Sequence, residues 1–162
     1  MRAWEAAKAS GVRLITGIEV QLSEGIKLVL LARDLTGYQN ICKLVTVARR
    51  RSRKGCYVLG PADFTGATDG IIALWLPAPE AHDEHGRWVA ATFPGNGWIS
   101  VQLHHGANDA KRLADLQRLG VRLQLPLVAS GDVHMHARGR RALQDTLTAI
   151  RLHCTVSERP EA

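Results

Sequence analysis

Short apolar segments alternate along this chain with segments of helical periodicity, and this alternation most restricts the folds open to it. In the second half, apolar segments at 70–76, 98–103 and 125–129 are predicted to be strands. A helix is predicted to open at Asn108 or Asp109, and another to cover 140–152. Strands separated by a helix are typical of βαβ units. The predicted fold class is therefore α/β, with a mostly parallel sheet and flanking helices.

The first half predicts a helix, a hairpin and a second helix. Residues 2–10 favour helix, the strands 12–20 and 26–32 can pair across a turn, and Thr36 can cap the next helix. Residues 77–97 contain prolines and glycines without periodicity, which predicts a long loop or insertion. These elements form one domain over 1–162 with about five strands, fewer than a closed barrel needs. Either the sheet is open, or βα units precede this chain.

Composition excludes several classes of protein. The chain has 162 residues, 46% hydrophobic and 22% charged, as expected for a globular domain with a core. No apolar run approaches the roughly 20 residues of a membrane helix, and the start lacks a signal peptide. Three scattered cysteines fit neither a disulfide framework nor a zinc finger. No dinucleotide, P-loop or serine-hydrolase motif is present. We therefore expect a cytoplasmic protein without membrane contact.

The segment 130–136 carries the sharpest local signal for chemistry. It follows a predicted parallel strand, and ligands in α/β folds bind beyond the carboxyl ends of strands. If the chain stays extended, Asp132, His134 and His136 project to the same side. Carboxylate and imidazole together can bind a divalent metal. Asp132 and His134 are therefore candidate metal ligands, with solvated polar residues at a strand end as the alternative.

Glu19 is a second candidate ligand, because it closes the predicted strand 12–20. Two strand ends that each offer a carboxylate could meet over one site, but an ion pair with an arginine at the rim is the alternative. His104 and His105 follow the strand 98–103 and are expected to have a structural or supporting role. His82 and His85 are expected in a solvated loop.

A basic segment closes the helix after Thr36. No acid occurs between Lys43 and Lys54, and the net charge of the chain is +6. Such a segment can complement the helix dipole as a solvated surface, or bind phosphates without sequence preference. The candidate nucleic-acid contacts are Arg49, Arg50, Arg51, Arg53 and Lys54.

Several segments together resemble the PHP (polymerase and histidinol phosphatase) domain of bacterial C-family DNA polymerases, most closely their error-prone relatives in damage-induced mutagenesis. The segments that carry the resemblance are 5–19, which ends in Gly17-Ile18-Glu19, then 28–32, 37–38, 48–51, 70–77, Gly131-Asp132-Val133-His134-Met135-His136 and 140–151. The resemblance implies an incomplete, distorted β/α barrel of the PHP type. It also implies Glu19, Asp132 and His134 as ligands of a divalent metal (Zn, Mn or Mg).

The chain also departs from this family. The opening His-x-His of the family lies upstream of residue 1, and Leu76-Pro77 stands where replicative members often carry a cysteine ligand. An incomplete ligand set predicts that metal is held weakly or not at all. The polymerase catalytic aspartates would lie beyond residue 162, so this chain alone is expected to be inactive.

The resemblance therefore predicts a PHP-domain fragment of an error-prone DNA polymerase, a nucleotidyltransferase of DNA replication and of repair after DNA damage. The fragment would support the polymerase module. Expected partners are DNA, through the full-length polymerase, and other replication or mutagenesis proteins. A second copy of the chain is a further expected partner, because open sheet edges invite pairing. Two alternatives stay open: a stand-alone metal-dependent phosphoesterase, and a catalytically silent module that binds DNA or protein.

Overall fold

The computed structural model describes residues 2–79 and 83–158. The chain divides into two compact units, Met1–Ser130 and Gly131–Ala162, and each is described by itself. Among the described helices, none is both long and apolar enough to cross a membrane.

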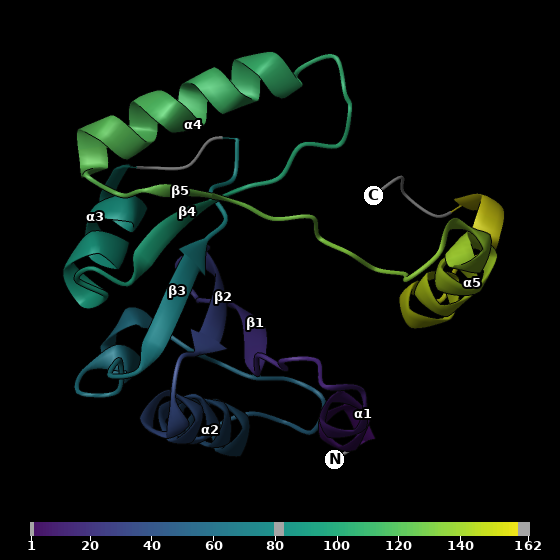
Figure 1. Cartoon of the computed structure of the whole chain (residues 1–162), viewed down its shortest axis with the longest axis horizontal. Helices are drawn as coiled ribbons and strands as arrows, with labels where there is room; N and C mark the ends of the chain where they lie inside the picture. Colours follow the sequence, from purple (N-terminus) through teal and green to yellow (C-terminus); the bar gives the residue numbers. More distant parts are fainter. Residues whose placement is uncertain (1, 80–82, 159–162) are drawn as a thin grey trace. The chain divides into compact units, whose positions relative to one another are not determined.

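The first unit holds four helices and five strands within its described part (Figure 1). In chain order these are α1 (Arg2–Ser10), β1 (Gly17–Gln21), β2 (Lys27–Ala32), α2 (Leu35–Arg50), β3 (Ile71–Trp75), α3 (Asp83–Thr92), β4 (Gly97–Val101), α4 (Asp109–Leu123) and β5 (Leu127–Ala129). A short 3-10 helix, Pro61–Phe64, lies between α2 and β3. The predicted strands and helices therefore occur in the predicted order, with one added helix, α3.

The five strands form one mixed sheet in the order β1-β2-β3-β4-β5. The pairs β1–β2 and β2–β3 are antiparallel, whereas β3–β4 and β4–β5 are parallel. The α/β class is thus confirmed, but only half of the strand pairs are parallel. The turn at 23–25 forces β1 and β2 into a hairpin, and β3 continues that antiparallel pattern. Within the described residues the sheet is open, with β1 and β5 at its edges.

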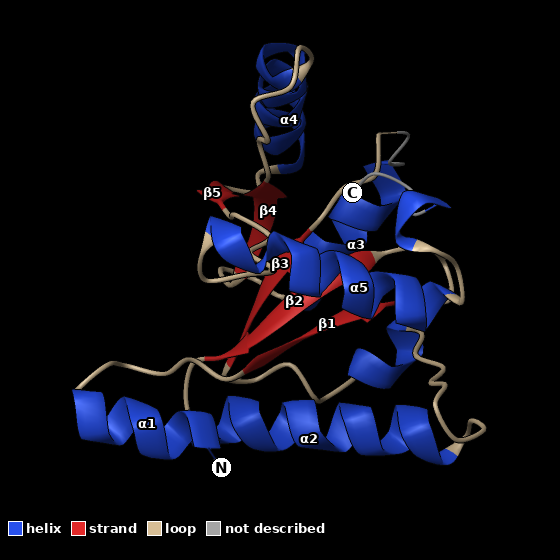
Figure 2. Cartoon of the chain, turned by 90° about the vertical axis from the view of Figure 1, so that its right-hand side faces the viewer, coloured by secondary structure: helices blue, strands red, loops and turns tan. Residues whose placement is uncertain are grey.

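Helices cover the sheet at both ends of the strand order. α2 contacts β1, β2 and β3, while α4 contacts β4 and β5; Figures 1 and 2 show the same arrangement. Between them lies a core in which alternate strand residues are buried. Leu28, Leu30, Ala73, Trp75 and Ile99 are each at most 1% exposed. Side chains of a strand point alternately to its two sides, so burial of every second residue means that one side of each strand faces the helices.

The start of α2 is fixed by Asp34 rather than by the predicted cap Thr36. The Asp34 carboxylate accepts a hydrogen bond from the Gly37 N–H at 2.9 Å. This bond, followed by the neighbouring Arg33 guanidinium, holds the pKa of Asp34 below its usual value. A Cβ at Gly37 would overlap the carbonyl of Gly70, so only glycine lets α2 approach the segment before β3 this closely.

Helix α3 overturns the loop predicted at 77–97. Val89 in α3 is fully buried, and Phe93, which directly follows the helix and donates its N–H to the Val89 carbonyl, is 2% exposed. Gly86 lets α3 lie against Trp75, since a Cβ there would clash with the indole ring. The surrounding prolines and glycines conceal this periodicity in the sequence. His85 lies in α3 rather than in a solvated loop, and His82 falls outside the described residues.

Strand β1 is shorter than the predicted strand 12–20. It begins at Gly17, which pairs with Leu31 near the end of β2. Val12 and Ile15 are 65% and 59% exposed. Since β2 ends at Ala32, residues 12–15 have no strand opposite them, and their apolar alternation does not produce a strand.

The second unit is small and has little core. It contains a 3-10 turn at Arg138–Arg140, helix α5 (Arg141–Leu152) and a further 3-10 turn at Val156–Glu158. The predicted helix 140–152 is confirmed to within one residue. Ala149 is the one buried residue among those described in this unit, while the apolar side chains of Leu147 and Ile150 are 54% and 65% exposed.

Candidate functional site

The basic segment lies at the carboxyl end of α2. The helix ends at Arg50, and the Ser52 hydroxyl donates to the carbonyl of Ala48 at 3.0 Å, which closes the last turn. Gly55, with φ near +91°, then reverses the chain. All five predicted contact residues of this segment are exposed at the surface. Exposure alone therefore does not separate them.

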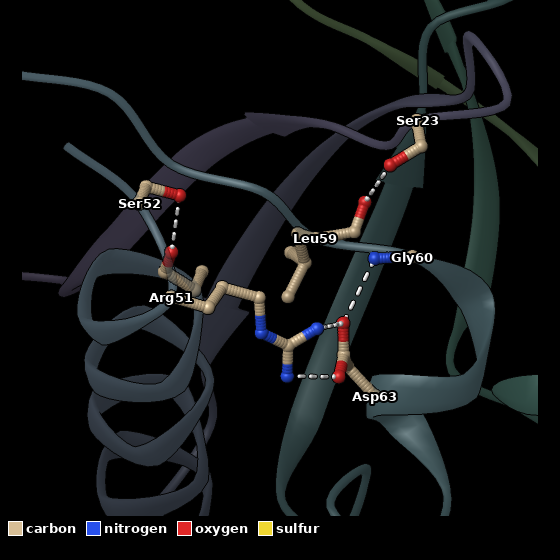
Figure 3. Close-up of polar contacts among 7 residues, drawn as sticks. Ser23, Arg51, Ser52, Leu59, Gly60 and Asp63 are labelled. Carbon is tan, nitrogen blue, oxygen red and sulfur yellow. Dashed lines mark hydrogen bonds and ion pairs between the residues drawn. The ribbon is translucent and has the colours of Figure 1, made fainter.

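Arg51 differs from its neighbours because its guanidinium donates hydrogen bonds to the carboxylate of Asp63 (Figure 3). Two parallel hydrogen bonds of 2.8 and 3.1 Å join the groups, a geometry that arginine favours. The same carboxylate accepts the Gly60 N–H at 2.9 Å. The Gly60 bond, and then the Arg51 charge, hold the pKa of Asp63 below its usual value. Arg51 is thus a structural residue that closes the loop between α2 and β3.

The segment 56–60, which returns from this loop, is anchored on the hairpin. Leu59 is 1% exposed, and its carbonyl accepts hydrogen bonds from the Ser23 N–H at 2.9 Å and the Ser23 hydroxyl at 3.2 Å (Figure 3). The Val58 N–H donates to the Ala48 carbonyl at 3.2 Å. The loop that carries the basic residues is therefore held at both its ends.

Arg49 is also engaged, though less tightly. Its guanidinium lies 5.6 Å from the ring centre of Tyr57 and donates to the Cys56 carbonyl at 3.2 Å. The Tyr57 hydroxyl accepts the Gln21 N–H at 2.8 Å, at the end of β1. Arg49 and Tyr57 together close a cavity of about 140 Å³ between α2 and β1. This pair packs the end of the sheet.

Three cations of the segment are left without such a role. The side chains of Arg50, Arg53 and Lys54 form no ion pair or hydrogen bond with any residue that the structure describes. The five residues predicted as one nucleic-acid surface therefore divide into two that build the loop and three that face solvent.

Glu19, the first predicted metal ligand, lies in β1 and forms an ion pair. Its carboxylate is 3.0 Å from the Lys27 ammonium group on β2, and both side chains are close to half exposed. The two residues lie diagonally across the hairpin on one face. Glu19 thus forms an ion pair, as the alternative expected, but with lysine rather than arginine as its partner.

Asp132 and His134 lie together in the second unit. The His134 Nε2 is 3.3 Å from the Asp132 carboxylate, and both side chains are substantially exposed. Asp132 has φ near +45°, so the chain is not extended there, and the condition on which a common side for 132, 134 and 136 was predicted is not met. β5 has already ended at Ala129. His136 lies instead with His134 beside a groove of about 260 Å³ against α5.

The described donors do not make up a metal site. Across residues 2–79 and 83–158, no group of three or more His, Cys, Asp or Glu side chains is arranged to hold a metal ion. Asp132 and His134 supply two donors, short of the four that a structural zinc site uses. No chemistry is therefore assigned to a metal here. A shared site of Glu19 with Asp132 and His134 stays a prediction.

His104 and His105 follow β4 and are both exposed. His105 has φ near +60° and turns the chain away from the sheet. Their predicted structural role stays a prediction.

Comparison with known proteins places this chain in a family. The model of the PHP domain matches residues 1–115, which is more than half of the chain. This chain belongs to the PHP domain family. The match includes Glu19 and the basic segment, and it ends before Asp132 and His134.

Individual relatives extend the likeness of this PHP domain to nearly its whole length. The chain is 54% identical to a protein of Pseudomonas savastanoi named "Error-prone DNA polymerase", over 98% of the chain. Proteins of the same name from Pseudomonas fluorescens (strain Pf0-1) and Dechloromonas aromatica are 52% and 47% identical over the same share. The chain spans 15 to 16% of the length of these relatives.

Sequence reasoning missed the partners of the basic segment. Asp63 was not singled out, although Gly60-Pro61 followed by an acid at 63 is typical of a helix start whose third residue bonds back. The contact of the Tyr57 hydroxyl with Gln21 has no signal in the sequence, because the two residues are 36 positions apart.

Proposed function

We propose that this chain serves as the PHP domain of an error-prone DNA polymerase, and supports the polymerase module during DNA replication and repair after damage. One observation carries the proposal: nearly the whole chain aligns, at 54% identity, with a part of a protein of that name. The two alternatives, a stand-alone phosphoesterase and a silent interaction module, are not favoured by these relatives.

The geometry is compatible with a supporting role. The first unit has a continuous core from β1 to β5, and the ion pair of Arg51 with Asp63 joins the two ends of its loop at 51–63. In the complete polymerase, which acts in the cytoplasm on DNA, the open sheet would be one part of the distorted barrel of the family. Further partners would be other replication or mutagenesis proteins, and a second copy of the chain at the open edges β1 and β5.

We further propose that a divalent metal contributes little to this support. Asp132 and His134 are two exposed donors, and Glu19 is neutralised by Lys27. A partial ligand set of this kind binds metal weakly.

A chimeric polymerase tests the supporting function. The matching segment of the Pseudomonas savastanoi relative is replaced by residues 1–162 of this chain, and primer extension by the full-length chimera is measured on a DNA template. We expect extension within about tenfold of the parent, since a chain that is 54% identical over nearly its whole length is expected to keep the same core packing.

A matched control shows that the transplanted domain matters. Leu30 is fully buried in β2, so the chimera with Leu30→Asp is expected to lose its fold and its extension activity. A chimera that is folded and stable, yet extends no primer, would contradict the proposal. The proposal would also be contradicted if the Leu30→Asp chimera extended primers as well as the unmodified chimera does.

A further inference from the structure

The structural division of the basic segment has a consequence for binding. Arg49 and Arg51 are held by Tyr57 and Asp63, whereas Arg50, Arg53 and Lys54 are held by nothing that the structure describes. Because the Asp63 charge is matched by Arg51, it does not offset the remaining three cations. The loop is therefore a fixed support that presents uncompensated positive charge.

The presented charges extend along α2. Lys43 is exposed and lies seven residues before Arg50, which places both on one face of the helix, about 10 Å apart along its axis. Arg53 and Lys54 continue from the helix end. Phosphates of one DNA strand follow one another at about 3.4 Å along the duplex axis, so this row can meet several of them.

We propose that Lys43, Arg50, Arg53 and Lys54, the free cations, bind the phosphate backbone of duplex DNA without reading its sequence. The inference rests on the proposed function, which brings DNA to this domain, and it names a surface for that contact. Arg49 and Arg51 position the segment and do not touch the DNA.

The structure favours backbone binding over base stacking. Tyr57 is the aromatic residue next to the free cations, but Arg49 lies over its ring and its hydroxyl is bonded to Gln21. A ring fixed in this way offers no platform for an unpaired base, which single-strand binders require. Ordinary duplex phosphates need only the cations.

The test measures binding of the 162-residue chain to a fluorescent 20-base-pair duplex of mixed sequence across a series of salt concentrations. Each phosphate contact contributes about 0.9 to the slope of log affinity against log salt. For Arg50→Gln, Arg53→Gln and Lys54→Gln combined, we expect the slope to fall by about 2 to 3 and the affinity at low salt to drop at least about tenfold.

A second triple variant controls for net charge. Arg87 lies on α3, and Lys111 and Arg118 lie on α4. Replacing these three residues by glutamine also removes two arginines and one lysine, but from another surface. We expect its affinity to stay within about twofold of the unchanged chain. Circular dichroism and thermal unfolding establish that both variants are folded.

Four results would overturn the inference. These are equal losses in the two triple variants, no duplex binding tighter than about 100 µM at low salt, tighter binding of a single-stranded oligonucleotide than of the duplex, and equal binding of a poly-glutamate of the same charge. Failure here while the chimera still extends primers would reject this surface and leave the supporting function standing. Failure of both would reject the function as well.

Discussion

The two units of this chain differ in what holds them together. In the first, 21 buried apolar residues join sheet and helices into one core; in the second, the described part buries Ala149 alone. The most recognisable chemical motif, Asp132 with His134, lies in the second unit, whereas the match to the PHP family model lies within the first. The motif that is most conspicuous in the sequence thus lies in the unit whose described part has the fewest buried residues.

The same contrast separates the candidate surfaces. The basic segment is attached to a packed core through Arg51, Leu59 and Asp63, so the backbone that carries its exposed charges is anchored. Asp132 and His134 contact each other but are supported by few buried groups. A ligand of the first surface would therefore meet an anchored backbone, whereas a ligand of the second would meet a segment with less support from packing.

The largest expected effect comes from matched truncations in the two units. Trp75 is 1% exposed in β3, and Trp75→Ala is expected to lower the free energy of unfolding by about 3–5 kcal/mol. Leu147 is 54% exposed in α5, and Leu147→Ala is expected to change it by less than about 0.5 kcal/mol. Urea unfolding followed by tryptophan fluorescence and circular dichroism measures both. Equal losses would remove the contrast between the units.

A smaller effect separates neighbours within the basic segment. Arg51→Gln leaves Asp63 without its bidentate partner and is expected to cost about 1–2 kcal/mol of unfolding free energy. Arg50→Gln, which removes the same charge one residue earlier, is expected to cost less than about 0.5 kcal/mol. Thermal unfolding of the two variants measures whether Arg51 is structural and Arg50 is not. If Arg50→Gln were the more destabilising, the structural role of Arg51 would be wrong.

The pH dependence of stability should report the same contact. The pKa of Asp63 is lower in the folded chain than its usual value of 3.8, because the Gly60 N–H and Arg51 favour the carboxylate. This carboxylate therefore stabilises the fold fully above pH 3.8, and its contribution is lost as pH falls through the lowered pKa. Asp63→Asn is expected to lose less stability than the unchanged chain between pH 5 and pH 3. Parallel pH profiles of the two proteins would contradict this expectation.

The smallest expected effect is that of metal on the second unit. Two exposed donors bind Zn²⁺ weakly, and 1 mM Zn²⁺ is expected to stabilise the chain by less than about 0.5 kcal/mol. His134→Ala should remove even this increment. Calorimetric titration with Zn²⁺ and Mn²⁺ measures it directly. Micromolar binding that His134→Ala and Glu19→Gln both abolish would contradict the present view, and would establish the shared site predicted from sequence.

Much of the fold follows from local patterns in the sequence. The hairpin β1–β2 is predicted by two apolar segments around a glycine turn, and α5 by its apolar spacing. Patterns fail where tertiary contacts decide. Residues 12–15 alternate like a strand but lack a partner, and α3 forms inside a proline- and glycine-containing segment because Val89 and Phe93 find a core to enter.

The candidate site was predictable in position but not in roles. The charge pattern located the basic segment, since no acid interrupts it. The distinction between Arg50 and Arg51 depends on Asp63, twelve residues away, and on the angle at which the loop returns. For the same reason, the ion pair of Glu19 with Lys27 follows from the register of the hairpin, which residue types alone do not specify.

Hydrogen exchange along the chain tests the contrast between the two units most directly. If the PHP-family segment is the self-supporting scaffold, the amides of β2 and β3 will exchange only through global unfolding, and those of α5 at least about tenfold faster. Exchange in α5 as slow as in β2 would contradict the account, because it would mean that the second unit shares the stability of the first.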